Sequence, residues 1–289
     1  MTDDHGIPPI DIIKEKLPGF SKGQKLIATF ILEHYEKASY MTAQKLGETV
    51  GTSESTVVRF ALELGFEGYP EMQKSLQAYT KTRLTALQRL EIADDRVDKS
   101  NILQSVLNHD INQIRATSDA ADSAEFALAV EQIVAAEKIY IFGAMSSNMP
   151  ARFLDYYLRL IFDNVVFVDE VGVSGIKQQM IRAGEGDVLI CISFPRYCNS
   201  AAETARFAKA RGVSVVAITD SKNSPLASHA NRILLAKSDM ASFADSLVAP
   251  LSLINALIVA IGMKKRIEIE QVFAKLEKIW NQENVYDGK

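Results

Sequence analysis

The sequence holds few of the residues that build disulfide frameworks or metal sites. Its 289 residues include two cysteines, Cys191 and Cys198, and four histidines, and neither cysteine stands at a metal-ligand spacing from a histidine. We therefore expect neither a disulfide framework nor a zinc site. The first strand-like run is also not followed by a glycine-rich G-x-G-x-x-G pattern, because the residues after Gly143 are Ala-Met-Ser-Ser. This difference argues against a dinucleotide-binding fold, and we expect no cofactor.

Long apolar segments and export signals are missing as well. The N-terminal ten residues are acidic and lack the apolar core of a signal peptide. The longest apolar run, residues 247–263, contains a proline and a glycine, and it is shorter than the roughly 20 residues of a membrane-spanning helix. We predict a buried helix there, and a cytoplasmic protein without a membrane partner. The net charge of −4 argues against a chain that binds nucleic acid through an overall positive charge.

The pattern of apolar residues divides the chain into two halves, as its length also suggests. Residues 10–90 show helical spacing throughout, for example in KLIATFILEHY. From Lys138 onward, short apolar runs typical of buried parallel strands alternate with helical segments; these runs are KIYIFG, NVVFVD, DVLICIS, VSVVAIT and RILLA. The alternation predicts an α/β domain with a five-stranded, parallel, doubly wound sheet. We expect an all-α domain at residues 1–80, a helical connector with a loop around 94–100 at residues 81–110, and the α/β domain at residues 111–289.

The segment TAQKLGETVGTSESTVVRFALELG has the spacing of a helix-turn-helix. Thr42 can cap a helix over 43–50, Gly51 can supply a left-handed turn, and Ser53 can cap a second helix that ends near Leu64. In such units the second helix enters the major groove and presents its first residues to base edges. The first turn is short and polar here, so we predict that the DNA contacts come from Ser53, Glu54, Ser55, Thr56 and Arg59.

An interaction module without DNA is the alternative for this segment, because plain three-helix units show the same spacing. Residues 20–90 are close to neutral, whereas phosphate neutralisation supplies much of the affinity for DNA. Two copies of the domain would double the phosphate contacts, so we predict a homodimer or a dimer of dimers. The apolar helix over 247–263 and the amphipathic stretch IEIEQVFAKLEKIW are the expected contact surfaces.

Polar residues follow the predicted strands of the α/β half, where ligands of doubly wound sheets bind. Ser146 and Ser147 follow the first strand, Ser193 and Arg196 follow the third, and Ser224 lies in a later loop. Hydroxyls and backbone N–H groups at helix starts can bind an anion, and arginine can donate two hydrogen bonds to a phosphate or carboxylate. We predict these five residues as the binding site of a small anion. The alternatives are that the serines only cap helices and that Arg196 pairs with a nearby acid.

Three segments resemble transcriptional regulators of the RpiR/MurR family; they are SESTVVRFALELGFEGYPEMQKSL, AKARGVSVVAITDSKNSPLASHANRIL and ADSLVAPLSLINALIVAI. The resemblance covers residues 20–280. It implies an N-terminal helix-turn-helix domain that binds an operator in double-stranded DNA. It also implies a C-terminal sugar isomerase (SIS) domain that binds an effector, usually a phosphosugar.

The two binding loops depart from the family pattern. SIS domains commonly read G-x-G-x-S after the first strand, and here Met145 replaces the second glycine while Ser147 keeps the serine. After the third strand they commonly read S-x-S-G-x-T. Ser193 matches this pattern, but Pro195, Arg196 and Cys198 stand where Ser, Gly and Thr are usual. We therefore expect an anionic effector that is either a phosphosugar or an organic acid.

A phosphosugar isomerase with an accessory N-terminal domain is the competing interpretation of the whole chain. An isomerase needs a positioned acid and base, and the candidates are His229, Glu203, Asp169 and Glu170. No serine–histidine–aspartate constellation can be recognised by spacing. We favour a regulator that is not an enzyme.

Overall fold

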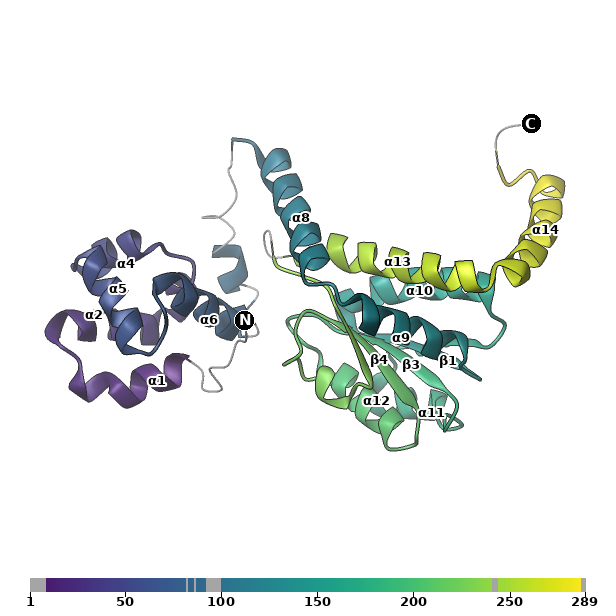
Figure 1. The fold of residues 1–289 in the computed structure, drawn as a ribbon, viewed down its shortest axis with the longest axis horizontal. Helices are drawn as coiled ribbons and strands as arrows, with labels where there is room; N and C mark the ends of the chain where they lie inside the picture. The colour runs from purple at the N-terminus through teal and green to yellow at the C-terminus, as the bar shows by residue number, and fades with distance from the viewer. Residues whose placement is uncertain (1–8, 82, 86, 92–99, 241–243, 287–289) are drawn as a thin grey trace. The chain divides into compact units, whose positions relative to one another are not determined.

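The computed structural model describes residues 9–81, 83–85, 87–91, 100–240 and 244–286. The chain forms two compact units, residues 1–98 and 99–289 (Figure 1). The loop predicted around 94–100 lies almost entirely outside the described residues. Each unit is considered by itself below.

Unit one is helical, as the sequence predicts. Its helices are α1 (Pro9–Lys16), α2 (Lys22–Glu33), α3 (Tyr35–Ala38), α4 (Ala43–Val50), α5 (Glu54–Glu63) and α6 (Tyr69–Lys81). Helix α2 begins with a capping box, in which the Ser21 hydroxyl accepts from the Gln24 N–H and the Gln24 side chain accepts from the Ser21 N–H. Apolar side chains from each of these helices fill one core, whose largest fully buried members include Ile13, Ile27, Ile31, Leu46, Phe60, Met72 and Leu76.

The turn between α4 and α5 forms as the residue types predict. The Thr42 hydroxyl accepts from the Lys45 N–H at 3.1 Å and caps α4. Gly51 ends α4 with φ +73° and ψ +36°, which is the left-handed conformation that glycine adopts at low cost. Gly47 allows the two helices to meet, because a Cβ atom there would lie 2.9 Å from the Thr52 carbonyl oxygen. The helix-turn-helix is therefore a close-packed unit with little room for larger residues at this crossing.

Unit two contains the predicted five-stranded parallel sheet. Its strands are β1 (Ile139–Gly143), β2 (Val165–Phe167), β3 (Val188–Ile192), β4 (Ser214–Thr219) and β5 (Arg232–Leu235), in the spatial order β2-β1-β3-β4-β5. Its helices are α8 (Ile102–Asp119), α9 (Ser123–Val134), α10 (Asn148–Ile161), α11 (Gly172–Gln179), α12 (Asn199–Lys209), α13 (Val248–Lys264) and α14 (Arg266–Gln282). Since chain order reverses between β1 and β3, the crevice expected for a ligand lies at the carboxyl ends of these two strands.

Helices cover both faces of this sheet, as the near-continuous apolar runs predict. Figure 1 shows α9, α10 and α13 on one side of the strands and α11 and α12 on the other. Along β1, Ile139 and Ile141 pack with the first group of helices, whereas Tyr140 and Phe142 pack with the second. The alternating side chains of one strand thus serve two separate cores.

The apolar run at 247–263 forms most of α13, and it is buried on one face only. Ile254, Leu257 and Ile261 of α13 are fully buried, while Val259 and Met263 are exposed. Helix α14 follows at the end of α13 (Figure 1), and none of its residues is buried. Among the described residues, no single helix is long and apolar enough to cross a bilayer; α13 and α14 reach that length and composition only as a pair bent by 97°.

Candidate functional site

The start of α5 carries a cluster of hydroxyl groups. Ser53 is the N-cap, with φ −85° and ψ 152°, and its Oγ accepts from the Thr56 N–H at 3.3 Å. The same oxygen lies 2.9 Å from the hydroxyl oxygens of Ser55 and of Thr56. Three hydroxyls therefore lie at the positive end of a helix, where the backbone N–H groups favour a negative partner.

Arg59 lies on the solvent side of the same helix. Its neighbours Val57 and Phe60 are fully buried, whereas Arg59 is exposed and its Nε donates to the Ser55 carbonyl oxygen at 3.3 Å. Arg59 lines an open depression together with Glu54, Ser55 and Val58. The residues predicted to contact DNA thus share one accessible face, and the core behind them fixes the helix.

The start of α2 lies beside the start of α5, which the sequence did not reveal. A Cβ atom at Gly23 would be 3.4 Å from both the Thr52 hydroxyl oxygen and the Thr56 methyl group. Lys22 and Lys25 of α2 line an open groove that also includes Thr49 and Val50 of α4. Two further cations therefore accompany the helix-turn-helix. The only hint in the sequence is the capping box that starts α2 one residue before Lys22.

The loop after β1 is shaped by a glycine and by a strained methionine. A Cβ atom at Gly143 would overlap the Ser147 carbonyl oxygen and lie 2.9 Å from the Ala151 methyl group, so only glycine fits. Met145, which stands where G-x-G-x-S has its second glycine, has φ +53°, in the left-handed region that glycine adopts at low cost. The Asn148 side chain donates to the Gly143 carbonyl oxygen at 3.1 Å and closes the loop.

Two serines at the carboxyl ends of the central strands are largely buried, and their hydroxyls have no partner in the described part of the chain. Ser147 follows β1 and is 4% exposed, and Ser193 follows β3 and is 3% exposed. Neither hydroxyl forms a hydrogen bond with another residue in the described part of the chain. Neither oxygen is among the fully enclosed side-chain atoms that lack a partner, so both hydroxyls keep some access to solvent and can form hydrogen bonds with water or with a ligand. Ser146, by contrast, is exposed on the same loop.

The loop after β3 is held by a tyrosine. The Tyr197 hydroxyl donates to an Asp220 carboxylate oxygen at 2.7 Å and so ties this loop to the end of β4. Burial, with a contribution from the Asp220 charge, raises the pKa of the Tyr197 phenol well above its usual value of 10. Arg196, the adjacent residue, is exposed, and no hydrogen bond or ion pair joins its side chain to another described residue.

Ser224 has a capping contact. Its hydroxyl is 2% exposed and accepts from the Ala227 N–H at 3.2 Å, at the start of the short 3₁₀ turn Ala227–His229. The hydroxyl hydrogen remains available to a ligand. This contact is the structural role that capping serines commonly have.

Glu170 joins the loops that follow three strands. Its Oε2 accepts from the Met145 N–H at 3.1 Å, and its Oε1 accepts from the Ser200 hydroxyl at 3.4 Å. The Cys198 sulfur lies 3.1 Å from the Ser200 oxygen and 3.9 Å from the same Glu170 oxygen. Sequence reasoning considered Glu170 only as an acid or base, and nothing in the sequence indicates these contacts.

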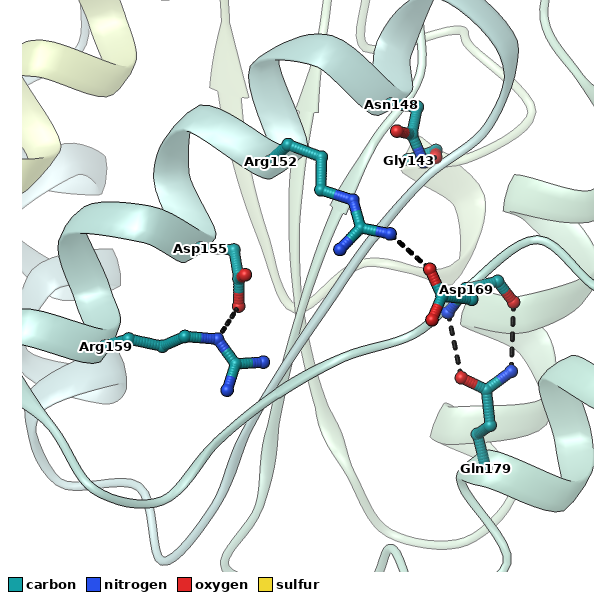
Figure 2. A network of polar contacts seen from close by, with 7 residues as sticks. All are labelled: Gly143, Asn148, Arg152, Asp155, Arg159, Asp169 and Gln179. Atoms are coloured by element: carbon teal, nitrogen blue, oxygen red, sulfur yellow. Dashed lines mark hydrogen bonds and ion pairs between the residues drawn. The ribbon is translucent and has the colours of Figure 1, made fainter.

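The neighbouring residue Asp169 is clamped in place (Figure 2). The Gln179 side chain accepts from the Asp169 N–H at 2.9 Å and donates to the Asp169 carbonyl oxygen at 3.0 Å. Arg152 of α10 forms an ion pair with the Asp169 carboxylate and lies over the Phe167 ring, 3.6 Å from its centroid. A second pair on α10, Arg159 with Asp155 at 2.7 Å, is separate from this clamp in Figure 2.

The acid–base candidates of an isomerase are mostly engaged in other contacts. Asp169 is paired with Arg152, and Glu203 is partly exposed and paired with Arg206, whose hydrogen bond lowers the pKa of Glu203. His229 lies in the 3₁₀ turn after β4. No group of three histidine, cysteine or carboxylate side chains in the described part of the chain could hold a metal ion.

Comparison with known protein families finds a match in each of the two units. Residues 9–83 match the helix-turn-helix domain of the rpiR family, and residues 132–260 match the SIS domain. An HTH-type transcriptional regulator of Caldanaerobacter subterraneus is 24% identical over 258 residues, which are 88% of this chain and 90% of the relative.

Two solved structures share the fold. The Vibrio vulnificus NanR protein complexed with ManNAc-6P has a TM-score of 0.56 and 20% identity, over 97% of this chain and 100% of that one. The sugar isomerase domain of an RpiR transcription factor from Sphaerobacter thermophilus has a TM-score of 0.59 and 23% identity, over 62% of this chain and 99% of that one. At these identities the likeness establishes the fold.

Proposed function

The chain joins a helix-turn-helix domain of the rpiR family to a SIS domain and so belongs with the RpiR-type transcriptional regulators, and from this premise we propose that a small anionic metabolite controls its binding to DNA. The metabolite is a phosphosugar or an organic acid. The observation that supports this proposal is that two largely buried serines, Ser147 and Ser193, have hydroxyls without a described partner at the carboxyl ends of β1 and β3, where the strand order reverses.

DNA binding is assigned to the exposed face at the start of α5. Ser53, Ser55 and Thr56 offer hydroxyls to phosphate or base edges, and Arg59 reads a base from the same face. Glu54 is included as an acceptor for cytosine N4, since it would otherwise repel phosphate. Lys22 and Lys25, beside this helix, suit contacts with backbone phosphates and add positive charge to a nearly neutral domain.

The test of this assignment is the substitution Arg59→Ala. A binding sequence is first selected from a random duplex library with the full chain, and affinity is then measured by fluorescence anisotropy at fixed salt. We expect Arg59→Ala to weaken binding by about 1–3 kcal/mol and to relax base preference at one position. Lys74→Ala on α6, another exposed cation of the same unit, is the control and should bind normally. Normal binding by Arg59→Ala would remove Arg59 from the DNA-contacting surface.

The effector site is assigned to five residues around the crevice. Ser146, Ser147 and Ser193 donate hydroxyl hydrogen bonds, Ser224 donates its remaining hydrogen, and Arg196 supplies a positive charge. The absence of any described partner for the Arg196 side chain favours a ligand-binding role over a structural ion pair. Thermal-shift screening of the full chain against phosphosugars and organic acids tests the assignment, because a ligand that binds the folded state raises the melting temperature. A hit that still stabilises Ser193→Ala and Ser147→Ala equally well would place the ligand elsewhere.

A non-catalytic role fits the proposal best. The relative described above is a transcriptional regulator, and two of the four candidate acids and bases, Asp169 and Glu203, are held in ion pairs. NMR spectra of the best ligand after prolonged incubation with the protein are expected to show no new sugar isomer. Its appearance at a rate proportional to protein concentration would favour the isomerase.

Self-association is proposed through the helices at the end of the chain. Val259 and Met263 of α13 and Ile267, Phe273 and Ile279 of α14 are exposed. Such apolar faces usually mark contact surfaces, and a second copy of the chain would also supply the second DNA-binding head. Light scattering at micromolar concentration should give a dimer or a dimer of dimers, and a monomer would contradict this part of the proposal.

A further inference from the structure

We propose that the Glu170 carboxylate is the resident anion of the effector crevice, and that an anionic effector binds by displacing it. This inference rests on the proposed function, because it assumes that the crevice between β1 and β3 receives an anion. It identifies Glu170 as a residue that determines specificity, and it predicts that a simple anion binds weakly.

Glu170 makes the contacts that a bound anion would make. One carboxylate oxygen accepts from the Met145 N–H, in the loop that leads into α10, and the other accepts from the Ser200 hydroxyl in the first turn of α12. Neither helix has a side-chain cap of its own: Ser147 before α10 and Cys198 before α12 make no capping hydrogen bond. Both helices are long enough to have a well-developed positive end. One carboxylate therefore occupies a backbone N–H in the 3₁₀ turn before α10 and a hydroxyl in the first turn of α12, which would otherwise be available to a ligand.

The backbone next to Glu170 is fixed, whereas its side chain is free to leave. Gln179 holds both backbone groups of Asp169, and Arg152 holds the Asp169 carboxylate. Glu170 itself is exposed, and the next residue, Val171, is 62% exposed. A rotation about the Glu170 side-chain bonds is enough to vacate the site, and it breaks no contact of the clamp.

The displaced site would contain more than the backbone group. Ser147 lies two residues after Met145, and Ser193 lies just after the neighbouring strand β3. Both residues are largely buried, and their hydroxyls have no partner in the described part of the chain. Glu170 does not reach either of them. An effector anion would gain the contacts that Glu170 gives up and could add the two hydroxyls.

Two negative groups cannot share this space at low cost. Charges about 4 Å apart repel strongly in the effective dielectric of a protein surface, so binding of an anion and residence of Glu170 exclude each other. A free anion must compete with a carboxylate that is tethered to the site and has a high effective concentration. The site therefore selects a ligand whose other groups bind elsewhere in the crevice, and it discriminates against inorganic phosphate.

The experiment measures the affinity of the full chain for inorganic phosphate at constant ionic strength by isothermal titration calorimetry. Glu170→Gln keeps the size and an acceptor oxygen but removes the charge. We expect it to bind phosphate about ten- to a hundredfold more tightly than the wild type, the range that corresponds to one charge-assisted hydrogen bond. Glu203→Gln removes a partly exposed acid of α12 that pairs with Arg206 and forms no hydrogen bond with Met145 or Ser200 in the described part of the chain, and its affinity should change less than threefold. Glu170→Ala should act in the same direction as Glu170→Gln.

The outcomes separate this inference from the function on which it rests. If the wild type binds phosphate, Ser193→Ala weakens that binding and Glu170→Gln does not strengthen it, then the crevice is an anion site but Glu170 is not its resident anion. Phosphate is raised to at least 50-fold the protein concentration, up to its solubility limit. If neither the wild type nor Glu170→Gln binds it there, both the proposed anion site and the proposed role of Glu170 are wrong. Unchanged melting temperatures of the variants without ligand would show that folding is not the cause.

Discussion

Met145 offers a direct test of how the loop after β1 is built, through the substitution Met145→Gly. Its φ of +53° lies in the left-handed region, where a residue with a Cβ atom is disfavoured by about 1–2 kcal/mol. Glycine instead loses about 0.5–1 kcal/mol through the greater freedom of the unfolded chain. The Met145 side chain is 72% exposed, so its removal sacrifices little burial, and the bond to Glu170 uses the backbone N–H and is retained. We expect a net stabilisation of about 0.5–1 kcal/mol.

Met149 supplies the matched control for this substitution. It is a methionine of similar exposure, 69%, but it lies in the first turn of α10. Met149→Gly should therefore destabilise the same unit by about 0.5–1 kcal/mol, because glycine is a poor helix former. Urea unfolding of the full chain, followed by circular dichroism, measures both changes. In thermal unfolding they should appear as opposite shifts of about 1–4 °C. Equal losses of stability in the two variants would show that Met145 carries no left-handed strain.

Two further predictions concern the loop after β3. Arg196→Ala should lower the affinity for the best ligand of the metabolite screen about ten- to a hundredfold; unchanged affinity with reduced stability would instead make the arginine structural. Tyr197→Phe removes the 2.7 Å hydrogen bond to Asp220 and should destabilise the second unit by about 1–3 kcal/mol in urea unfolding, since Asp220 is buried. The raised pKa of Tyr197 means that this contribution is complete below about pH 10 and is lost as the pH rises further. Stability measured at pH 9 and pH 11 should therefore fall more in the wild type than in Tyr197→Phe.

Much of the fold could be predicted because it depends on local signals. Five continuous apolar runs predict five strands covered on both faces, and each of them is a strand of the sheet. Thr42, Gly51 and Ser53 predict the boundaries of α4 and α5, because caps and left-handed turns need particular residue types whatever surrounds them. The prediction of a buried helix at 247–263 is only half correct, because the helix forms but is buried on one face only. A uniformly apolar sequence does not indicate which face a protein core will cover, and one face of α13 remains exposed.

Residues of the candidate site could be predicted only where their position just after a strand determines where they lie. Ser147 and Ser193 could be named because residues just after parallel strands meet at one edge of a sheet. The contact of Glu170 with Met145 joins residues 25 positions apart, and the contact of Tyr197 with Asp220 joins residues 23 positions apart. Such contacts depend on which loops face each other and on their exact conformations. Neither property has a periodic signal in the sequence. For the same reason, the approach of α2 to the start of α5 could not be predicted.

The departures from the SIS pattern have a common physical consequence for the crevice. In the usual pattern, glycines leave backbone N–H groups open to a phosphate. Here Met145 has a left-handed backbone and donates its N–H to Glu170. Tyr197 holds the loop after β3, and the Arg196 side chain of this loop has no hydrogen-bond or ion-pair partner among the described residues. Under the proposed function, anion recognition in this chain would depend on a pair of opposite charges on neighbouring loops and not on open backbone groups. A ligand that carries both an anionic group and hydrogen-bond donors can satisfy Arg196 and the displaced Glu170 together, whereas a bare anion can satisfy only one of them.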